Sequence, residues 1–334
     1  MAVRIGINGF GRIGRYMTRL LATDQDVRLV AVNARAENAA LVHLLKYDSV
    51  HGRLTETATA TEEGFELAGQ QVAVTRHPAG EWSWGDLGVD IVLETTGKFT
   101  SRDPCRQHLE RGAKKVLIAA PGKDADTTIV MGVNHQHYKP DAHHIISNAS
   151  CTTNCLAPVA KVVHEQFGIE HGLMTTIHSY TMSQRILDGS HKDLRRGRAA
   201  AMSMLPTTTG AAKAVTMVLP ELEGRLDGMA VRVPTPNVSL VDLVVNLASD
   251  VSPEAVNLAL RSAAEGPLQN ILGYTEEPLV SMDFNGSIFG GVVDGPCTTV
   301  LHNRLAKLIV WYDNESGFSN QLLRLTRMVA NSLG

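Results

Sequence analysis

The chain has 334 residues, of which 44% are hydrophobic and 19% charged, and its formal net charge is −3. This length exceeds one typical hydrophobic core, so we expect two domains. The near-neutral charge gives no indication of binding to nucleic acid or to an anionic membrane, and no apolar run reaches the roughly 18 residues that span a bilayer. The N-terminus lacks the apolar segment of a signal peptide, and four cysteines are too few for a disulfide scaffold. We therefore expect a cytoplasmic protein.

The N-terminal segment has the pattern strand, glycine-rich turn, helix, strand. Residues 3–7 form a short apolar run, a helical pattern covers 13–21, and a second apolar run covers 27–32. The turn between the first strand and the helix contains G-x-G-x-x-G, with Gly9, Gly11 and Gly14 in the conserved spacing of that motif. Such glycines let the backbone approach a pyrophosphate, and the helix N-terminus supplies N–H donors. The segment therefore predicts a dinucleotide site.

The residue that selects between cofactors is unusual. An NAD-type fold places Asp or Glu about twenty residues beyond the glycines, where it binds the ribose 2′-hydroxyl. Here the second strand ends in Asn33-Ala34-Arg35. Ala34 removes the repulsion that a carboxylate would exert on a 2′-phosphate, and Arg35 can pair with that phosphate, which favours NADP. The alternatives are that Glu37 takes the carboxylate's place or that Arg35 points to solvent.

Further strands and helices alternate through the first half of the chain. Strands are expected at 90–94, 115–119 and 144–146, and helices at 38–46 and 103–111. This alternation predicts an α/β fold, a Rossmann doubly wound parallel sheet over residues 1–150. Thr96 and Gly97 follow a strand end, where such sheets bind ligands. The histidines at 135, 137, 143 and 144 lie in an expected surface loop, and no metal site is predicted.

Cys151 is the strongest catalytic candidate. It follows an apolar strand within Ser150-Cys151-Thr152-Thr153-Asn154-Cys155 and precedes a helical stretch that ends at Phe167. The positive end of the helix dipole should lower the pKa of such a thiol and favour the thiolate. His178, at the end of the next strand, could act as its base for attack on a carbonyl. The alternative is that Cys151 is a small buried apolar residue.

The second half of the chain is rich in hydroxyl and arginine side chains. These include Thr181, Arg196, Thr209 and Arg232, and Gly210 precedes a helical pattern whose N-terminus suits an anion. Together they favour a phosphorylated substrate. Long strands at 228–233, 239–247, 298–301 and 307–312 predict an α+β catalytic domain over 151–314 with a mixed, largely antiparallel sheet. A C-terminal helix, about 315–334, is expected to pack back on the first domain.

Four segments together resemble phosphorylating glyceraldehyde-3-phosphate dehydrogenase. They are residues 7–15, 147–155, 206–213 and 311–315, and the likeness extends over essentially the whole chain. The resemblance implies a homotetramer that oxidises glyceraldehyde 3-phosphate, with inorganic phosphate and NAD or NADP, to 1,3-bisphosphoglycerate through a cysteine thioester.

The same resemblance implies roles for individual residues. Cys151 would be the nucleophile and His178 the base; Thr181 and Arg232 would hold the substrate phosphate. The attacking phosphate would be bound by Ser150, Thr152, Arg196, Thr209 and Gly210. Arg12 and Ile13 would approach the pyrophosphate, and Asn314 would orient the nicotinamide amide.

The chain departs from the NAD-dedicated members of that family at two cofactor positions. Those members usually have Asp in place of Ala34, and a proline where this chain has Ser190, in a loop that approaches a neighbouring subunit's cofactor. Both departures favour use of NADP, or of both cofactors. A family aromatic is also replaced by Ser316, for which the sequence offers no interpretation.

Two alternatives stay open at this point. The first is erythrose-4-phosphate dehydrogenase, a close relative. The second is a redox-sensing or binding protein on the same scaffold, because a reactive thiol can be oxidised reversibly.

Overall fold

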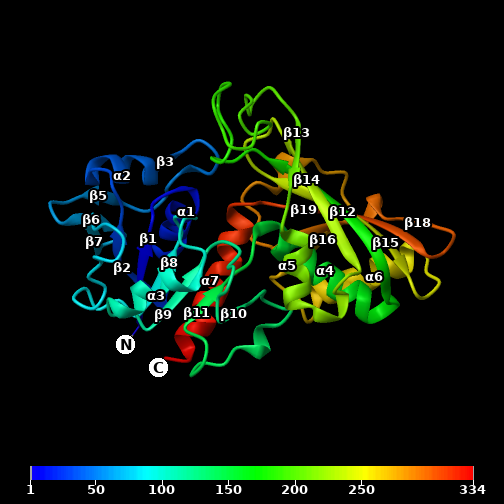
Figure 1. Ribbon diagram of the computed structural model, residues 1–334, viewed down its shortest axis with the longest axis horizontal. Helices are drawn as coiled ribbons and strands as arrows, with labels where there is room; N and C mark the ends of the chain where they lie inside the picture. The colour runs from blue at the N-terminus through cyan, green and yellow to red at the C-terminus, as the bar shows by residue number, and fades with distance from the viewer. Residues whose placement is uncertain (1, 334) are drawn as a thin grey trace. The chain divides into compact units, whose positions relative to one another are not determined.

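The computed structural model describes residues 2–333. They form two compact units. The first comprises the described part of Met1–Ile129, His135–Ala149 and Leu322–Gly334, and the second comprises Val130–Asn134 and Ser150–Gln321. Figure 1 shows the strands and helices of each unit. No helix within residues 2–333 combines the length and apolar character needed to cross a bilayer.

The first unit is built on a nine-stranded sheet in the order β10-β11-β9-β8-β1-β2-β7-β6-β5. Its strands are β1 (Val3–Asn8), β2 (Val27–Asn33), β5 (Ala58–Ala60), β6 (Gly64–Leu67), β7 (Gln70–Thr75), β8 (Ile91–Glu94), β9 (Lys115–Ile118), β10 (Thr127–Thr128) and β11 (Ile145–Ser147). All neighbours from β10 to β7 pair in parallel, and only β7-β6 and β6-β5 are antiparallel. The central strands β8 and β9 are buried along their whole length, as expected for a sheet covered on both faces.

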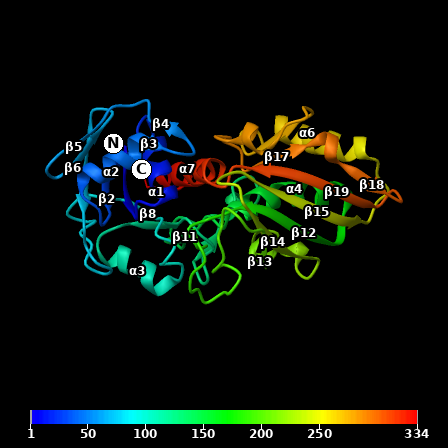
Figure 2. The same cartoon turned by 90° about the horizontal axis from the view of Figure 1, so that it is seen from above.

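Three helices connect the parallel strands of this sheet: α1 (Arg12–Leu21), α2 (Asn38–Lys46) and α3 (Arg102–Glu110). From β1 the chain passes through α1 to β2 on one side, whereas from β8 it passes through α3 to β9 on the other. Because such crossovers are right-handed, α1 and α3 cover opposite faces (Figure 2). The order of strands therefore reverses between β1 and β8, at the point where doubly wound sheets bind ligands. A short hairpin, β3 (Tyr47–Asp48) and β4 (Gly52–Arg53), follows α2.

The second unit contains an eight-stranded mixed sheet, in the order β13-β14-β12-β15-β19-β17-β16, with β18 paired to β19. Its strands are β12 (Ile169–Ser179), β13 (Leu205–Thr208), β14 (Leu226–Val233), β15 (Ser239–Leu247), β16 (Leu272–Thr275), β17 (Gly291–Asp294), β18 (Thr299–Leu301) and β19 (Leu305–Tyr312). β12 pairs with β14 and β16 with β17 in parallel; the other pairs are antiparallel. The predicted fold class, a Rossmann sheet plus a domain with a mixed sheet, is confirmed.

The helices of the second unit are α4 (Cys151–Phe167), α5 (Ala211–Val218) and α6 (Pro253–Glu265), with α7 (Ser316–Asn331) beginning in this unit. α4 contacts both α5 and α6, and the three lie side by side against the sheet (Figure 1). Along β15 every second residue is buried, the alternation of a strand with one face against a core. The C-terminal part of α7 belongs to the first unit, where Arg327 Nη2 donates to Asp24 Oδ2 at 2.6 Å.

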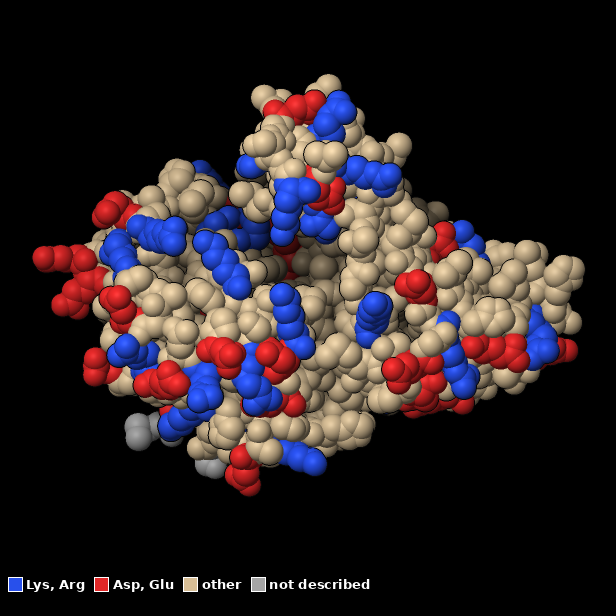
Figure 3. Space-filling view, in the orientation of Figure 1, with Lys and Arg blue, Asp and Glu red and all other residues tan. Residues whose placement is uncertain are grey.

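The surface is mixed in charge. Figure 3 shows basic and acidic side chains interspersed over the face drawn, as the net charge of −3 leads one to expect. Among the described residues no group of three His, Cys, Asp or Glu side chains is placed to hold a metal ion.

Candidate active site

Cys151 is the first residue of α4, in the second unit. The chain leaves β11 through Ala149, whose φ of +56° turns the backbone sharply into the helix. Ser150 is the N-cap, and its Oγ accepts a hydrogen bond from Thr153 N at 3.0 Å. The cap fixes the first turn of α4 and with it the position of the thiol.

His178 lies beside this thiol, near the end of β12. Its Nε2 is 3.5 Å from Cys151 Sγ, and only 5% of the residue is exposed. The ring of Tyr312 meets the imidazole edge-on, with centroids 5.9 Å apart. The Tyr312 hydroxyl hydrogen-bonds Thr152 Oγ1 and Thr176 Oγ1, each at 2.8 Å. These contacts hold the histidine, the start of α4 and β19 in one packed cluster.

The other imidazole nitrogen meets two competing groups. Nδ1 lies 2.7 Å from Ser179 O, which would accept its proton, and 2.8 Å from Arg232 Nη1, which would donate to it. When Nδ1 is protonated, Nε2 is free to accept the proton of the thiol. When Nδ1 accepts from Arg232, Nε2 carries the proton instead. Arg232 Nη1 also donates to Ser179 O at 2.8 Å, so the arginine and the histidine share one carbonyl.

The pKa of the Cys151 thiol differs from the value expected for a thiol at a helix start, and that of His178 is also shifted. Burial raises the pKa of the Cys151 thiol, and the charge of Arg232 opposes that rise. Burial and the nearby Arg232 charge lower the pKa of His178 to about 3. The expected net lowering of the thiol pKa is therefore not seen, because desolvation of the thiolate outweighs the helix dipole. A neutral imidazole beside a protonated thiol can act as its general base.

The sheet brings hydroxyl and guanidinium groups to the same region. Arg232 on β14 pairs in register with His178 on β12 and with Leu205 on β13. Arg196 Nη2 donates to Thr207 Oγ1, also on β13, at 3.0 Å. Arg232 and His178 thus lie on neighbouring strands, and Arg196 contacts the next strand, β13.

The remaining predicted anion ligands have local partners. Thr181 Oγ1 hydrogen-bonds Ser183 Oγ at 2.9 Å. Thr209 Oγ1 accepts from Ala211 N at 3.2 Å, and Gly210 is the N-cap of α5. The hydroxyl of Thr152 is buried against Tyr312, whereas its backbone N–H lies in the first turn of α4, a place where helices can bind anions.

Asn314 follows β19 and is held by two serines. Its Oδ1 accepts from Ser179 Oγ at 2.8 Å and from Ser239 Oγ at 3.0 Å. Within residues 2–333 no hydrogen bond of its Nδ2 is seen. Ser190 lies in the exposed 181–204 loop, where its backbone oxygen accepts from Arg185 Nη2 at 2.8 Å.

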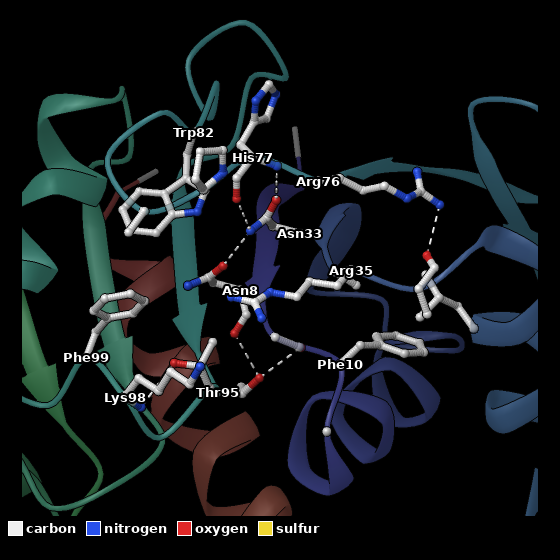
Figure 4. Close-up of a pocket in the computed structure, with 18 of the residues that line it drawn as sticks. Asn8, Phe10, Asn33, Arg35, Arg76, His77, Trp82, Thr95, Lys98 and Phe99 are labelled. Atoms are coloured by element: carbon white, nitrogen blue, oxygen red, sulfur yellow. Dashed lines mark hydrogen bonds between the residues drawn. The ribbon is translucent and has the colours of Figure 1, made fainter.

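The first unit carries a pocket of about 600 Å³ at the carboxyl ends of β1, β2 and β8 (Figure 4). Six of the residues proposed from the sequence for cofactor binding line it: Gly9, Gly11, Asn33, Ala34, Arg35 and Thr96. A Cβ at Gly14 would lie 2.3 Å from Gly9 O, so close packing of α1 on the turn requires glycine there. A Cβ at Gly11 would meet no protein atom within 4 Å, so the space before it is open for a ligand. The pocket therefore fits a nucleotide whose phosphates approach the glycine turn.

Two arginines line this pocket, and they differ in their partners. Arg76 Nη2 donates to Ala36 O at 2.9 Å and to Asn38 Oδ1 at 2.8 Å, which ties it to the loop after β2. No hydrogen bond or ion pair of the Arg35 side chain is seen within the described chain, and Figure 4 shows that side chain extending among the pocket residues. Ala34 leaves no carboxylate beside it. Glu37, the alternative ribose ligand, has 89% of its side chain exposed and faces Arg76 at 3.9 Å.

The other predicted cofactor residues lie outside the residues that line this pocket. Arg12 pairs with Asp48, with Nη2 to Oδ1 at 3.0 Å. Ile13 and Gly14 lie in the first turn of α1, and Gly97 follows β8 with φ +68°.

The chain is similar to known proteins over both of its units. The family model for the NAD binding domain of glyceraldehyde 3-phosphate dehydrogenase matches residues 3–102, and that for its C-terminal domain matches residues 150–314. A glyceraldehyde-3-phosphate dehydrogenase of Geobacillus stearothermophilus is 57% identical over 332 residues, 99% of each chain. Glyceraldehyde-3-phosphate dehydrogenase 1 of Bacillus subtilis is 54% identical over 332 residues, again 99% of each chain. A glyceraldehyde-3-phosphate dehydrogenase of Streptomyces coelicolor is 53% identical over 337 residues, 100% of each chain.

The chain belongs to the glyceraldehyde-3-phosphate dehydrogenase family. Its NAD binding domain contains the pocket of the first unit, and its C-terminal domain contains Cys151, His178, Arg232 and Asn314. Membership of this family agrees with the resemblance that the four sequence motifs indicated.

Sequence reasoning missed several residues of these sites. Trp82, His77, Arg76 and Phe99 line the nucleotide pocket from loops, and no local pattern marks them. The part played by Tyr312 was also missed, because its hydroxyl joins Thr152 to Thr176 across distant segments. Ser316, which replaces a family aromatic, is the first residue of α7 and is fully buried, and its N donates to Asp313 Oδ1 at 2.8 Å.

Proposed function

We propose that this protein is a phosphorylating glyceraldehyde-3-phosphate dehydrogenase. It oxidises glyceraldehyde 3-phosphate, with inorganic phosphate and a nicotinamide cofactor, to 1,3-bisphosphoglycerate, and the reaction is reversible. The observation that carries the proposal is the 3.5 Å approach of His178 Nε2 to Cys151 Sγ at the capped start of α4, in a chain more than half identical to enzymes of that name.

The thiol and imidazole account for the covalent steps. His178 takes the thiol proton, Cys151 Sγ forms a bond to the aldehyde carbon as the C=O π pair moves to oxygen, and the imidazolium returns its proton to that oxygen, giving a neutral hemithioacetal. The cofactor's contribution is to accept a hydride. His178 removes the hydroxyl proton of the hemithioacetal as the hydride departs, which leaves a thioester on Cys151. An oxygen of inorganic phosphate then attacks the thioester carbon, the C–S bond breaks, and the acyl phosphate leaves.

Two groups of anion ligands fit the two phosphates of this reaction. We assign Thr181 and Arg232 to the substrate phosphate. We assign Ser150, Thr152, Arg196, Thr209 and Gly210 to the attacking phosphate, with α4 and α5 both presenting N-termini there. Arg232 has the further effect of tuning His178, because both are within hydrogen-bond distance of Ser179 O.

For the cofactor we propose acceptance of NADP, alone or together with NAD. Support comes from Ala34, which brings no negative charge, and from Arg35, whose guanidinium extends into the pocket without a protein partner in the described chain. An Arg paired with a 2′-phosphate makes strong, charge-assisted hydrogen bonds. Ser190 is proposed as a further donor, from a neighbouring subunit, and Asn314 Nδ2 as the donor to the nicotinamide amide.

We further propose a homotetramer. The 181–204 loop bears several large apolar side chains that are mostly exposed: Met182 (90%), Ile186 (83%), Leu187 (72%), Leu194 (86%), Met202 (79%) and Met204 (73%). A cluster of this kind marks an interaction surface, and we assign a second copy of this chain as its partner. Native mass spectrometry should give four times the chain mass; a monomer would contradict the assignment.

The four free cysteines fit a reducing compartment, for which the cytoplasm stays our prediction.

Assay of the purified protein tests the proposed activity. Reduced cofactor should form continuously only when glyceraldehyde 3-phosphate, inorganic phosphate and the oxidised cofactor are all present; without phosphate its formation should stop once every Cys151 carries the acyl group. Turnover at an undiminished rate without phosphate would contradict the phosphorolytic step. Higher kcat/KM with erythrose 4-phosphate than with glyceraldehyde 3-phosphate would show that the substrate assignment is wrong.

A further inference from the structure

Glu94 is a buried carboxylate that the proposed chemistry does not use. It is the last residue of β8, and its side chain is fully buried, as is that of His108 on α3. Four donors reach it: Asn8 Nδ2 at 2.6 Å and His108 Nε2 at 3.2 Å meet Oε2, while Thr96 N at 2.8 Å and Thr96 Oγ1 meet Oε1. A buried carboxylate satisfied in this way is stable only while all of its donors stay in place.

The hydrogen bonds fix where the proton of His108 lies. Trp84 Nε1 can only donate, and it donates to His108 Nδ1 at 2.9 Å. Nδ1 must therefore be an acceptor, so the single proton of a neutral imidazole is on Nε2, which donates to Glu94. Every contact of Glu94 is with a donor, and its interaction with His108 is a hydrogen bond that Glu94 Oε2 accepts from Nε2.

These contacts join the walls of the nucleotide pocket to one another. Asn8 precedes the glycine turn, and its Oδ1 accepts from Asn33 Nδ2 at 2.9 Å; Asn33 Oδ1 in turn accepts from His77 N at 2.9 Å. On the other side, the ring of Trp82 stacks on His108 with centroids 3.8 Å apart. Asn8, Asn33, His77 and Trp82 all line the pocket, and Figure 4 shows them around it.

We propose that Glu94 is a positioning residue for the cofactor. It holds the glycine turn through Asn8 and the end of β8 through Thr96. Through His108 it also holds the Trp82 wall, so the pocket has its binding shape before the cofactor arrives. The inference rests on the proposed nucleotide site in the first unit. A pocket formed in advance binds more tightly because less ordering is needed on binding.

The substitution Glu94→Gln tests this with little change of volume. Its amide oxygen can still accept from Thr96, but its NH₂ then faces two other donors, Asn8 Nδ2 and His108 Nε2. Asn8 can turn its oxygen toward the amide only by losing the bond from Asn33. We expect the Kd of the oxidised cofactor to rise at least about tenfold, the loss associated with a hydrogen bond to a charged group. Glu66→Gln, which removes an exposed carboxylate from the same sheet, is the matched control and should change Kd less than about twofold.

A pair of variants at His108 separates positioning from packing. The amide nitrogen of Gln can take the place of Nε2 and keep the bond to Glu94, whereas the amide oxygen of Asn can take the place of Nδ1 and keep only the bond from Trp84. Both lose the ring that stacks on Trp82. We therefore expect His108→Asn to bind the cofactor several-fold more weakly than His108→Gln. This pair also decides the matter should Glu94→Gln fail to fold.

The measurements should be made on the full-length, cofactor-free protein. Equilibrium dialysis gives the Kd of the oxidised cofactor, amide hydrogen exchange reports on the 94–97 segment, and alkylation of Cys151 by iodoacetamide reports on the second unit. The proposal predicts weaker binding and faster exchange at 94–97 in Glu94→Gln, with alkylation in the cofactor-free state unchanged. Equal Kd values for Glu94→Gln and the parent, or for the two His108 variants, would overturn it. Failure of the parent to bind either cofactor would instead overturn the proposed function.

Discussion

The imidazole of His178 stands between the thiol of Cys151, 3.5 Å from Nε2, and the guanidinium of Arg232, 2.8 Å from Nδ1. The contact between Cys151 and His178 joins the start of α4 to the end of β12, two segments that are separated by the whole helix and its following strand. Its chemistry depends on the protonation of the ring, which burial and Arg232 hold in the neutral form.

Protonation of His178 should make the fold sensitive to acid. Its pKa is about 3 in the folded protein and near 6.5 when unfolded, so below pH 6.5 the unfolded chain binds more protons and stability falls. Between pH 6.5 and pH 5 this one group should cost about 2 kcal/mol. In His178→Gln that part of the loss is absent. Urea unfolding of the parent and of His178→Gln at several pH values measures this difference in the free energy of unfolding. Parallel losses of stability in the two proteins would show that the ring of His178 is not held neutral.

The N-cap of α4 should be needed for activity as well as for stability. Ser150→Ala removes the side-chain oxygen that accepts from Thr153 N. Ser252→Ala removes the equivalent cap of α6, because Ser252 Oγ accepts from Ala255 N at 3.2 Å. Each should lower the free energy of unfolding by about 1 kcal/mol. Only Ser150→Ala should also lower kcat, because only that cap positions the thiol. Equal kcat in the two variants would mean that the cap has no part in positioning Cys151.

The two pocket arginines should affect cofactor use differently. Arg35→Gln removes the proposed partner of the 2′-phosphate, so KM for NADP should rise by about tenfold or more while KM for NAD stays nearly constant. Arg76→Gln frees the loop at Ala36 and Asn38 and should raise both KM values together. Steady-state kinetics with each cofactor distinguish the two. A rise in KM for NAD alone after Arg35→Gln would contradict the assignment of Arg35.

Residue 34 gives an independent test of cofactor selection. Ala34→Asp restores the carboxylate that binds a ribose 2′-hydroxyl and repels a 2′-phosphate. The ratio of kcat/KM for NADP to that for NAD should fall by about tenfold or more, because one lost charge-assisted contact is worth that much. An unchanged ratio would mean that other residues select the cofactor.

Much of the fold could be predicted because its main elements have strong local patterns. The expected bounds of α2 and β15 agree with the structure, since the first has apolar residues at helical spacing and the second is rich in Val and Leu. Strands β5 to β7 were not predicted: they are short, lie at the sheet edge, and two of their pairings are antiparallel in a segment with no helix between them.

The candidate site was predictable in its residues but not in its environment. Cys151 and His178 could be named because a thiol at a helix start and a histidine at a strand end are local features. The direction of the thiol pKa could not be foreseen, because it depends on burial by distant residues such as Tyr312 on β19. Arg76 and Trp82 reach the nucleotide pocket from loops, and only the folded chain brings them there.

The covalent role of Cys151 is tested most directly by trapping the acyl enzyme. The protein should be mixed with glyceraldehyde 3-phosphate and oxidised cofactor in the absence of inorganic phosphate, quenched in acid, digested and analysed by mass spectrometry. We expect the acyl mass on the peptide that contains Cys151, its disappearance on adding phosphate, and neither adduct nor turnover in Cys151→Ser. Turnover of Cys151→Ser at the parent's rate, with no adduct on the parent, would contradict the account.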